Sequence, residues 1–317
     1  IYENIHNLKD KINSSKDLNN FTKLMESLEK EITIFHAKAV NEIITASKVK
    51  IDFIGFHGQT IFHNSKEKIS IQLGDGKLLS ELTKKTVVYN FRKNDLSQGG
   101  EGAPLSPIFH KLLVDQNKIN LPVCVLNIGG IANITNVYKD YKLSACDVGP
   151  GMCLVDKWVR LNSKKRYDVK GSLAKSGKIN QLILNKALKN FTYKKNKSYD
   201  IKDFNPAFVD GLSLSDGAAT LTEYTAKILI RNPAFSSFKK KVVIVCGGGR
   251  KNKFLIERIK KNNINIKFID DFNLNGDFIE SQAFAYLAIR SYLKLPISFP
   301  ETTGVDKPCT GGIIIKN

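Results

Sequence analysis

The sequence lacks the patterns that identify several common classes of protein. No apolar run approaches the roughly 18 residues of a membrane-spanning helix, and the segment Ile1 to Asn4 does not resemble a secretion signal. The five cysteines form an odd number and include no Cys-x-x-Cys pair, which disfavours a disulfide framework or a zinc site. These absences predict a soluble, cytoplasmic protein whose cysteines are reduced core residues.

Three catalytic signatures are also absent. The sequence contains no Walker-type Gly-Lys-Ser/Thr, no Gly-x-Ser-x-Gly elbow and no full Gly-x-Gly-x-x-Gly pattern. A P-loop ATPase, a serine hydrolase and a dinucleotide-binding fold are therefore disfavoured.

What the chain does contain is enough apolar material for a core and a large excess of positive charge. Its 317 residues are 42% hydrophobic, which suits two domains or one large α/β unit. The formal charge of +19 could indicate nucleic-acid binding, but the lysines are spread along the chain rather than clustered. We expect a solvated lysine-rich surface that helps to attract an anionic substrate, and no nucleic-acid partner.

Strand-like and helix-like segments alternate, which predicts α/β layers. Strands are expected at 51–56, 69–73, 86–89, 123–128, 131–137, 143–148 and 242–246. Helices are expected at 17–47 (one helix or two abutting), 104–115, 151–161, 177–189, 215–231, from 250 onward, and at 278–293. The apolar stripe of 17–47, which includes Phe35 and Ile43, is predicted to be core.

The segment from Asn90 to Leu105 is the best candidate for chemistry. It follows the buried strand 86–89 and places Arg92 and a lone aspartate, Asp95, on what reads as a glycine-rich turn. Glycines there allow close approach of a ligand to the backbone. Asp95 is therefore our candidate for a catalytic base.

Histidines flank another turn, between the first two strands. His57 and His63 enclose Gly58 to Thr60, a spacing that neither a helical metal pair nor a zinc finger uses. We expect a substrate contact from His57 or Gln59, with hydrogen bonds that stabilise the turn as the alternative.

Three further glycine turns lie at strand ends in the second half of the chain. Gly129 and Gly130 follow Asn127 and could expose amide groups to an anion, although a plain hairpin would look the same. Asp147 precedes Gly149 and Gly151 at a helix start, where amides bind phosphate and the carboxylate can hold magnesium. The third turn, Gly247-Gly248-Gly249, suits adenosine packing against flat backbone.

The motifs, taken in order, resemble those of the anhydro-N-acetylmuramic acid kinase family. They are Phe56 to Thr60, Phe91 to Leu105, Asn127 to Thr135, Asp147 to Gly151, Ala218 to Thr222, Gly247 to Arg250 and Ser298 to Gly304. The resemblance covers about residues 20 to 315. It implies an actin-like kinase fold, α/β, with two ribonuclease-H-like domains: 1–121 with about 300–317, and 122–299.

The resemblance also implies an activity and a set of residue roles. A member of this family opens the 1,6-anhydro ring of the amino sugar and phosphorylates O6, using ATP, Mg²⁺ and a water molecule. Asp95 would activate the water, and Asp147 would contact the metal. The Asn127, Gly129 and Gly130 turn, together with Asp147, Gly149 and Gly151, would contact phosphate, and Gly247, Gly248 and Gly249 would contact the nucleotide. His57, Gln59, Arg92 and Glu280 would line the sugar pocket, with a solvated helix-start charge as the alternative for Glu280.

Some positions depart from the family pattern. The Gly-Thr-Ser-x-Asp-Gly-x-Asp hairpin that wraps the ATP phosphates is not found before residue 20, and the chain does not start with methionine. We expect either a piece of a longer protein or loss of the hairpin, with impaired phosphorylation by this polypeptide alone. Met152, Asn90 and Lys195-Asn196 replace residues usual in the family. A catalytically inactive sugar-binding relative is the alternative function, and a homodimer stays open.

Overall fold

The computed structural model describes residues 1–193, 198–236 and 242–317. The Lys195-Asn196 departure lies outside these ranges. Two compact units are present: unit 1 comprises Ile1–Phe109 with Ser281–Asn317, and unit 2 comprises His110–Glu280. The domain boundaries expected from the sequence lie further along the chain, at 121 and about 300.

Unit 2 is built on a five-stranded sheet with the order β7-β6-β5-β8-β9. Its strands are β5 (Val123–Ile128), β6 (Ile131–Val137), β7 (Leu143–Pro150), β8 (Val242–Cys246) and β9 (Asn265–Phe268). β6 runs antiparallel to both β5 and β7, whereas β5, β8 and β9 are parallel. Numbered along unit 2, the order is third, second, first, fourth, fifth, with the second strand reversed.

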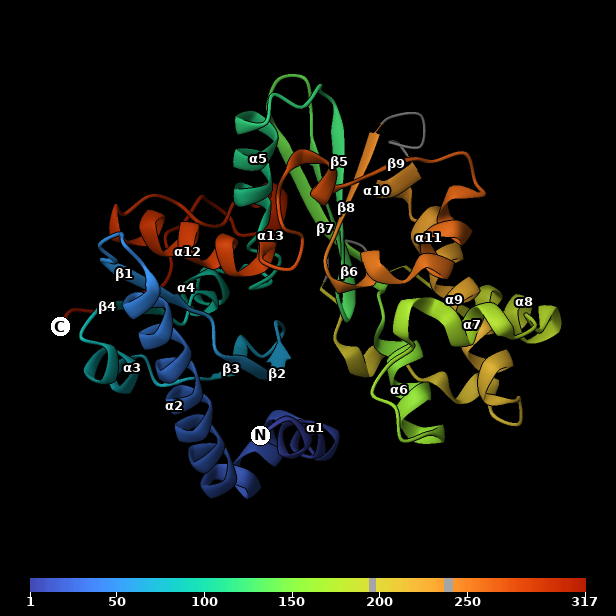
Figure 1. The fold of residues 1–317 in the computed structure, drawn as a ribbon, viewed down its shortest axis with the longest axis horizontal. Helices are drawn as coiled ribbons and strands as arrows, with labels where there is room; N and C mark the ends of the chain where they lie inside the picture. The colour runs from blue at the N-terminus through green and yellow to red at the C-terminus, as the bar shows by residue number, and fades with distance from the viewer. Residues whose placement is uncertain (194–197, 237–241) are drawn as a thin grey trace. The chain divides into compact units, whose positions relative to one another are not determined.

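Helices cover both faces of this sheet (Figure 1). One face carries a large apolar core in which Leu126 and Val245 pack with Leu229 of α9 and Leu255 of α11. The opposite face carries α5. The helices of this part of the chain are α5 (Pro107–Gln116), α6 (Cys153–Asn162), α7 (Ser172–Ser176), α8 (Gln181–Asn190), α9 (Leu214–Arg231), α10 (Pro233–Ser236) and α11 (Lys253–Lys260), with short 3-10 turns at η2 (Val169–Gly171), η3 (Ile201–Asp203), η4 (Pro206–Val209), η5 (Gly248–Lys251) and η6 (Ile269–Phe272).

Unit 1 contains a three-stranded sheet and a separate hairpin. The sheet order is β1-β4-β10, with β1 (Phe53–Phe56) parallel and β10 (Ile313–Ile315) antiparallel to β4 (Thr86–Tyr89). The hairpin joins β2 (Gln59–Asn64) to β3 (Ile69–Leu73). Helices α1 (Tyr2–Lys11) and α2 (Thr22–Ala46) precede β1, with the 3-10 turn η1 (Ser15–Phe21) between them.

The unit 1 sheet is buried on both faces because alternate residues of β4 point to different cores. Val87 packs with Leu28 and Ile32 of α2, and with α3 (Gly76–Thr83), while Val88 packs with Leu287 of α12 (Ile279–Tyr292). Two short helices complete the unit, α4 (Arg92–Ser97) and α13 (Pro300–Thr303).

Every predicted strand is present, but β2, β9 and β10 were not predicted, and Gln59 to His63 belong to β2 rather than to a turn. Several helix predictions also need correction. The expected helix at 104–115 begins at Pro107, and the expected 177–189 helix begins at Gln181 because Asn180 caps it through its side chain. The 17–47 segment is a 3-10 turn followed by α2. Its stripe is core only in part, since Phe35 and Ile43 are each 61% exposed.

The five cysteines are all free. Among the described residues, no helix is both long and apolar enough to cross a membrane.

Candidate functional site

Asp95 lies on the first turns of α4, not on the expected glycine-rich turn. The glycine-rich segment instead folds back over the carboxylate: Gly102 N–H donates to Oδ2 at 2.6 Å, and Thr303 Oγ1 donates to Oδ1 at 2.5 Å. A Cβ added to Gly100 would stand 2.2 Å from Oδ2, so only glycine fits there. Asp95 is thus a buried carboxylate, 1% exposed, held by two donors.

His57 and Arg92 form a second polar pair in unit 1. Arg92 donates to His57 Nε2 from Nε at 3.2 Å, and its Nη1 donates to the Gly102 carbonyl at 3.2 Å. Because Arg92 can only donate, Nε2 accepts, and Nδ1–H therefore donates to the Gly58 carbonyl at 2.9 Å. Burial and the Arg92 charge lower the pKa of His57 to about 3. His57 is a neutral imidazole of defined tautomer.

Arg92 therefore links the histidine turn to the loop that covers Asp95. Gln59, at the start of β2, is exposed. The structure thus brings Arg92 and His57 together, with Arg92 also on the backbone of Gly102, and leaves Gln59 facing solvent.

In unit 2, two of the predicted residues, Asp147 and Asn127, lie on one row across the sheet. Asp147 of β7 is paired with Asn133 of β6, Asn133 with Asn127 of β5, and Asn127 with Cys246 of β8. Directly opposed residues share a face of the sheet. This set, here called the polar row, lies close to the carboxyl ends of β5 and β8, where open α/β sheets bind ligands.

The polar row suits a hard divalent cation. Asn133 Oδ1 is buried and has no hydrogen-bond partner among the described residues. Asp147 is buried, and its Oδ2 accepts the Tyr199 N–H at 2.8 Å. Oxygen ligands from one carboxylate and neighbouring amides fit Mg²⁺, which keeps several waters and substrate phosphates in its shell. In the described ranges no three His, Cys, Asp or Glu side chains group as a metal site.

The hairpin glycines and the start of α6 are bonded to each other. The Gly151 and Met152 amides donate to the Gly130 and Gly129 carbonyls at 2.9 and 2.8 Å, and the Cys153 amide also reaches Gly130 O at 3.1 Å. These helix-start amides already have acceptors, so the hairpin and the helix start brace one another. Gly151 is required, because a Cβ there would lie 2.2 Å from the Gly129 oxygen.

The third glycine turn forms a flat surface at the end of β8. Gly247 has φ +78° and lies against Asn127 and Ile128, while Gly249 packs on the Ile128 side chain. A Cβ on Gly248 would meet no described atom within 4 Å, and Gly248 is exposed. This open backbone is compatible with a stacked or packed ligand.

Arg250 anchors this turn. Its guanidinium donates to Asp270 at 2.7 and 3.1 Å, to Asp277 at 2.9 Å and to the Gly247 carbonyl at 3.1 Å. The arginine's charge is neutralised by two carboxylates. It positions the glycine turn and does not present a free cation to a ligand.

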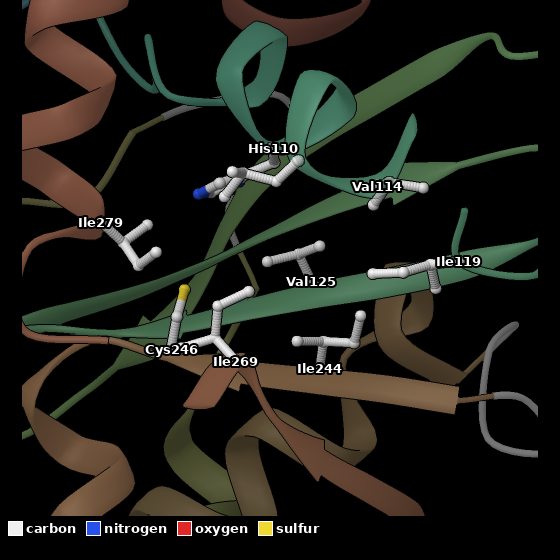
Figure 2. A pocket seen from close by; sticks show the side chains of 9 residues that line it. His110, Val114, Ile119, Val125, Ile244, Cys246, Ile269 and Ile279 are labelled. Carbon is white, nitrogen blue, oxygen red and sulfur yellow. The ribbon is translucent and has the colours of Figure 1, made fainter. Parts of the chain in front are cut away.

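Glu280 is exposed in the first turn of α12. Burial raises the pKa of the Cys246 thiol to about 12, and the Glu280 charge acts in the same direction, which places Glu280 near the end of β8 and the polar row. An apolar pocket lies beneath α5 on the same face, lined by Val125, Ile244 and Cys246 (Figure 2). It is too narrow to admit water, so it is not a ligand site.

The sequence did not single out three contributors to the candidate site. They are Thr303, which bonds Asp95, the Asn133 acceptor in the polar row, and the Asp270 and Asp277 pair, which holds Arg250. Asn133 carried a usable signal, because it lies within the glycine motif and opposite Asp147 in a hairpin register. Thr303 lies within the Ser298 to Gly304 motif, but nothing in that motif indicates a contact with Asp95, which is 208 residues away.

The five-strand order of unit 2, with its reversed second strand and glycine turns at strand ends, defines a ribonuclease-H-like α/β protein, the class that includes the actin-like kinases. A family model described as anhydro-N-acetylmuramic acid kinase matches residues 3–317. The chain belongs to the anhydro-N-acetylmuramic acid kinase family.

Curated relatives of that name agree with this assignment. The Pelagibacter ubique protein is 55% identical over 100% of this chain and 88% of its own length. The Zymomonas mobilis protein is 41% identical over 89% of this chain and 79% of its own length. The Brucella canis protein is 37% identical over 92% of this chain and 82% of its own length. These comparisons lend no support to the expectation that the chain's activity is impaired.

Two solved structures are also similar, at 15% identity. They are the activator of 2-hydroxyisocaproyl-CoA dehydratase from Clostridium difficile with bound ADPNP (TM-score 0.35, 56% of this chain and 63% of that one) and a ParM filament from Clostridium botulinum (TM-score 0.31, 82% and 64%). At such scores neither match supports the assignment.

Proposed function

We propose that the protein is an ATP-dependent hydrolytic sugar kinase that converts a 1,6-anhydro amino sugar, 1,6-anhydro-N-acetylmuramic acid, into the 6-phosphate of the opened sugar during recycling of cell-wall material. The observation that carries the proposal is the buried Asp95 carboxylate on a glycine-wrapped helix, in a chain of this family. Water, sugar and ATP are the three reactants.

Asp95 takes one proton from water, and the water oxygen forms a bond to the anomeric carbon. The bond from that carbon to O6 breaks, and O6 bonds to the γ-phosphorus of ATP. The bond from the γ-phosphorus to the β,γ-bridging oxygen breaks, and ADP leaves. Atoms and charge balance, because the proton from water remains on Asp95 until solvent removes it.

The sugar side is assigned to unit 1. Arg92 holds His57 neutral and in one tautomer, so His57 offers a polar edge without a charge. Gln59 is exposed and supplies amide donors and acceptors for sugar hydroxyls. Glu280, the last residue of unit 2, is the further sugar contact that the family resemblance implies.

The nucleotide side is assigned to unit 2. In this assignment Gly247, Gly248 and Gly249 receive the adenosine, and Asp147 with the Gly129 and Gly130 hairpin lines the phosphate side. The Gly149 to Gly151 turn supports that hairpin, because the Gly151 amide donates to the Gly130 carbonyl rather than to a phosphate. Bound Mg²⁺ would neutralise charge that develops on the transferred phosphoryl group. Asp147 would hold its shell, and Asn133 and Asn127 would orient its waters.

The test compares wild type with Asp95→Asn in an assay of ATP-dependent phosphorylation of the anhydro sugar. We expect the substitution to lower kcat by about 10²- to 10⁴-fold, the usual contribution of a general base. Asp115→Asn, at an exposed carboxylate near the end of α5, serves as the matched control and should keep full activity.

Wild type that binds the sugar but transfers no phosphate, with Asp95→Asn behaving identically, would contradict a kinase and favour the sugar-binding alternative. Thermal unfolding and sugar affinity of each variant show that lost turnover is not lost folding.

A further inference from the structure

Thr303 joins two segments that surround the proposed base. Its hydroxyl donates to Asp95 Oδ1 at 2.5 Å, and its backbone carbonyl accepts the Glu101 N–H at 2.8 Å. One residue of α13 thus contacts both the carboxylate and the loop that covers it. Thr303 is 1% exposed, so water does not compete for either bond.

The other carboxylate oxygen is fixed by the same loop. Gly102 N–H donates to Oδ2, and Gly102 is itself held by the Arg92 guanidinium on its carbonyl. With one donor on each oxygen, the carboxylate has a single orientation.

The Thr303 hydroxyl also has a second acceptor within reach. Its Oγ1 lies 3.5 Å from the Phe299 carbonyl, a longer contact than the one to Asp95. When Asp95 carries a proton on Oδ1, that proton can be donated to Thr303 Oγ1, and the hydroxyl hydrogen can turn to Phe299. The same side chain can therefore accommodate both protonation states.

We propose that Thr303 is a positioning residue for Asp95: it orients the ionised carboxylate toward water and accommodates the carboxyl group after proton transfer. This inference rests on the proposed function of Asp95. Thr303 neither gives nor takes a net proton in the reaction, so it acts through Asp95 alone.

Other titratable or charged groups surround the same carboxylate. The Cys309 thiol has its pKa raised, first by burial and also by the Asp95 charge. The His63 ring lies against Gly102, Arg92 bonds the Gly102 carbonyl, and Glu101 accepts the Ser65 hydroxyl. A pH profile must therefore be compared between variants that leave all four groups in place.

The experiment measures kcat/KM against pH for wild type, Thr303→Val and Thr303→Ser. Valine keeps the shape and removes the hydroxyl, so the acid limb should move and the plateau should fall roughly tenfold or more. Serine restores the donor and should return both toward wild type.

Thr302→Val is the matched structural control. Thr302 is the neighbouring buried threonine; its hydroxyl donates to the Phe299 carbonyl at 3.1 Å and accepts the Phe299 N–H at 3.2 Å. We expect this change to lower the melting temperature without moving the acid limb.

Two results would overturn the inference: a Thr303→Val profile that coincides with wild type, or an equal shift in Thr302→Val. If Asp95→Asn retains wild-type turnover, the base assignment itself fails, which is a distinguishable outcome. Sugar affinity and thermal unfolding of each variant show whether the carboxylate of Asp95 is misoriented or the protein is unfolded.

Discussion

At the scale of single residues, burial and hydrogen bonding set the state of each polar group. Asp95 is buried with a donor on each oxygen, whereas His57 accepts from a cation and remains neutral. Asn133 shows the third case, a buried acceptor with no described partner. An unsatisfied buried oxygen costs free energy unless a ligand supplies the missing contact, and the proposed Mg²⁺ or one of its waters would supply it to Asn133 Oδ1.

A buried histidine makes the stability of the protein depend on pH. Burial lowers the pKa of His110 to about 4, while an unfolded histidine titrates near 6.5. Between these values the unfolded chain binds more protons, so the free energy of unfolding falls as pH falls from 6.5 toward 4. Full protonation of His110 in the unfolded state alone would lower the free energy of unfolding by about 3 kcal/mol.

Denaturant unfolding of wild type and His110→Gln at pH 7.5 and 4.5 tests this dependence. We expect wild type to lose about 2 to 3 kcal/mol more than the variant over that range. Glutamine keeps a polar partner for the Thr135 hydroxyl, 2.8 Å from the ring nitrogen in wild type. His57 titrates in the same direction, so some slope remains in the variant. Equal losses in both proteins would contradict the assignment to His110.

At the scale of elements, the sequence predicted buried strands best. The runs that became β3, β4, β5, β6 and β8 were placed with their observed bounds, because continuous apolar segments between turn residues admit few other interpretations. The short helix α4 was missed, since the glycines that follow it suggested a turn. The contact that explains those glycines, the Asp95 carboxylate against Gly100, exists only in three dimensions.

The same limit applies to the candidate site. Asp95, Asp147 and the glycine turns were visible as motifs at strand ends. The contact of Thr303 with Asp95 and the role of Arg250 as an anchor were not visible, because the first depends on a partner distant in the chain and the second on the carboxylates Asp270 and Asp277.

Two neighbouring glycines of one turn provide a test of the nucleotide surface. A Cβ on Gly248 meets nothing described within 4 Å, whereas a Cβ on Gly249 would lie 2.3 Å from the Ile128 side chain. Gly248→Ala should therefore fold normally and weaken ATP binding about tenfold by blocking close approach to backbone. Gly249→Ala should lose about 1 to 3 kcal/mol of stability through overpacking.

Calorimetric titration with ATP and thermal unfolding of both variants separate the two effects. Unchanged ATP affinity in a folded Gly248→Ala protein would remove this turn from the nucleotide site.

At the scale of the whole molecule, the excess of 49 Lys and Arg over 30 Asp and Glu is the dominant property. A spread positive charge creates a long-range field that favours encounter with anions, and ATP is an anion. The same field would favour nucleic acid, but base reading requires clustered contacts that the sequence pattern does not predict. The dependence on salt concentration distinguishes the encounter with ATP from the chemical step. Screening by salt weakens the long-range attraction between charges but does not act on bond making in a closed site.

We therefore expect kcat/KM for ATP to fall roughly tenfold when the salt concentration rises from about 20 to about 300 mM, with kcat nearly constant. Steady-state kinetics at fixed Mg²⁺ measure both quantities. A variant with four exposed lysines changed to glutamate, Lys66, Lys164, Lys165 and Lys178, should show a shallower dependence and a lower kcat/KM at low salt. If kcat falls in parallel with kcat/KM, salt acts on the folded enzyme or on the chemical step, and the charge excess has no steering role.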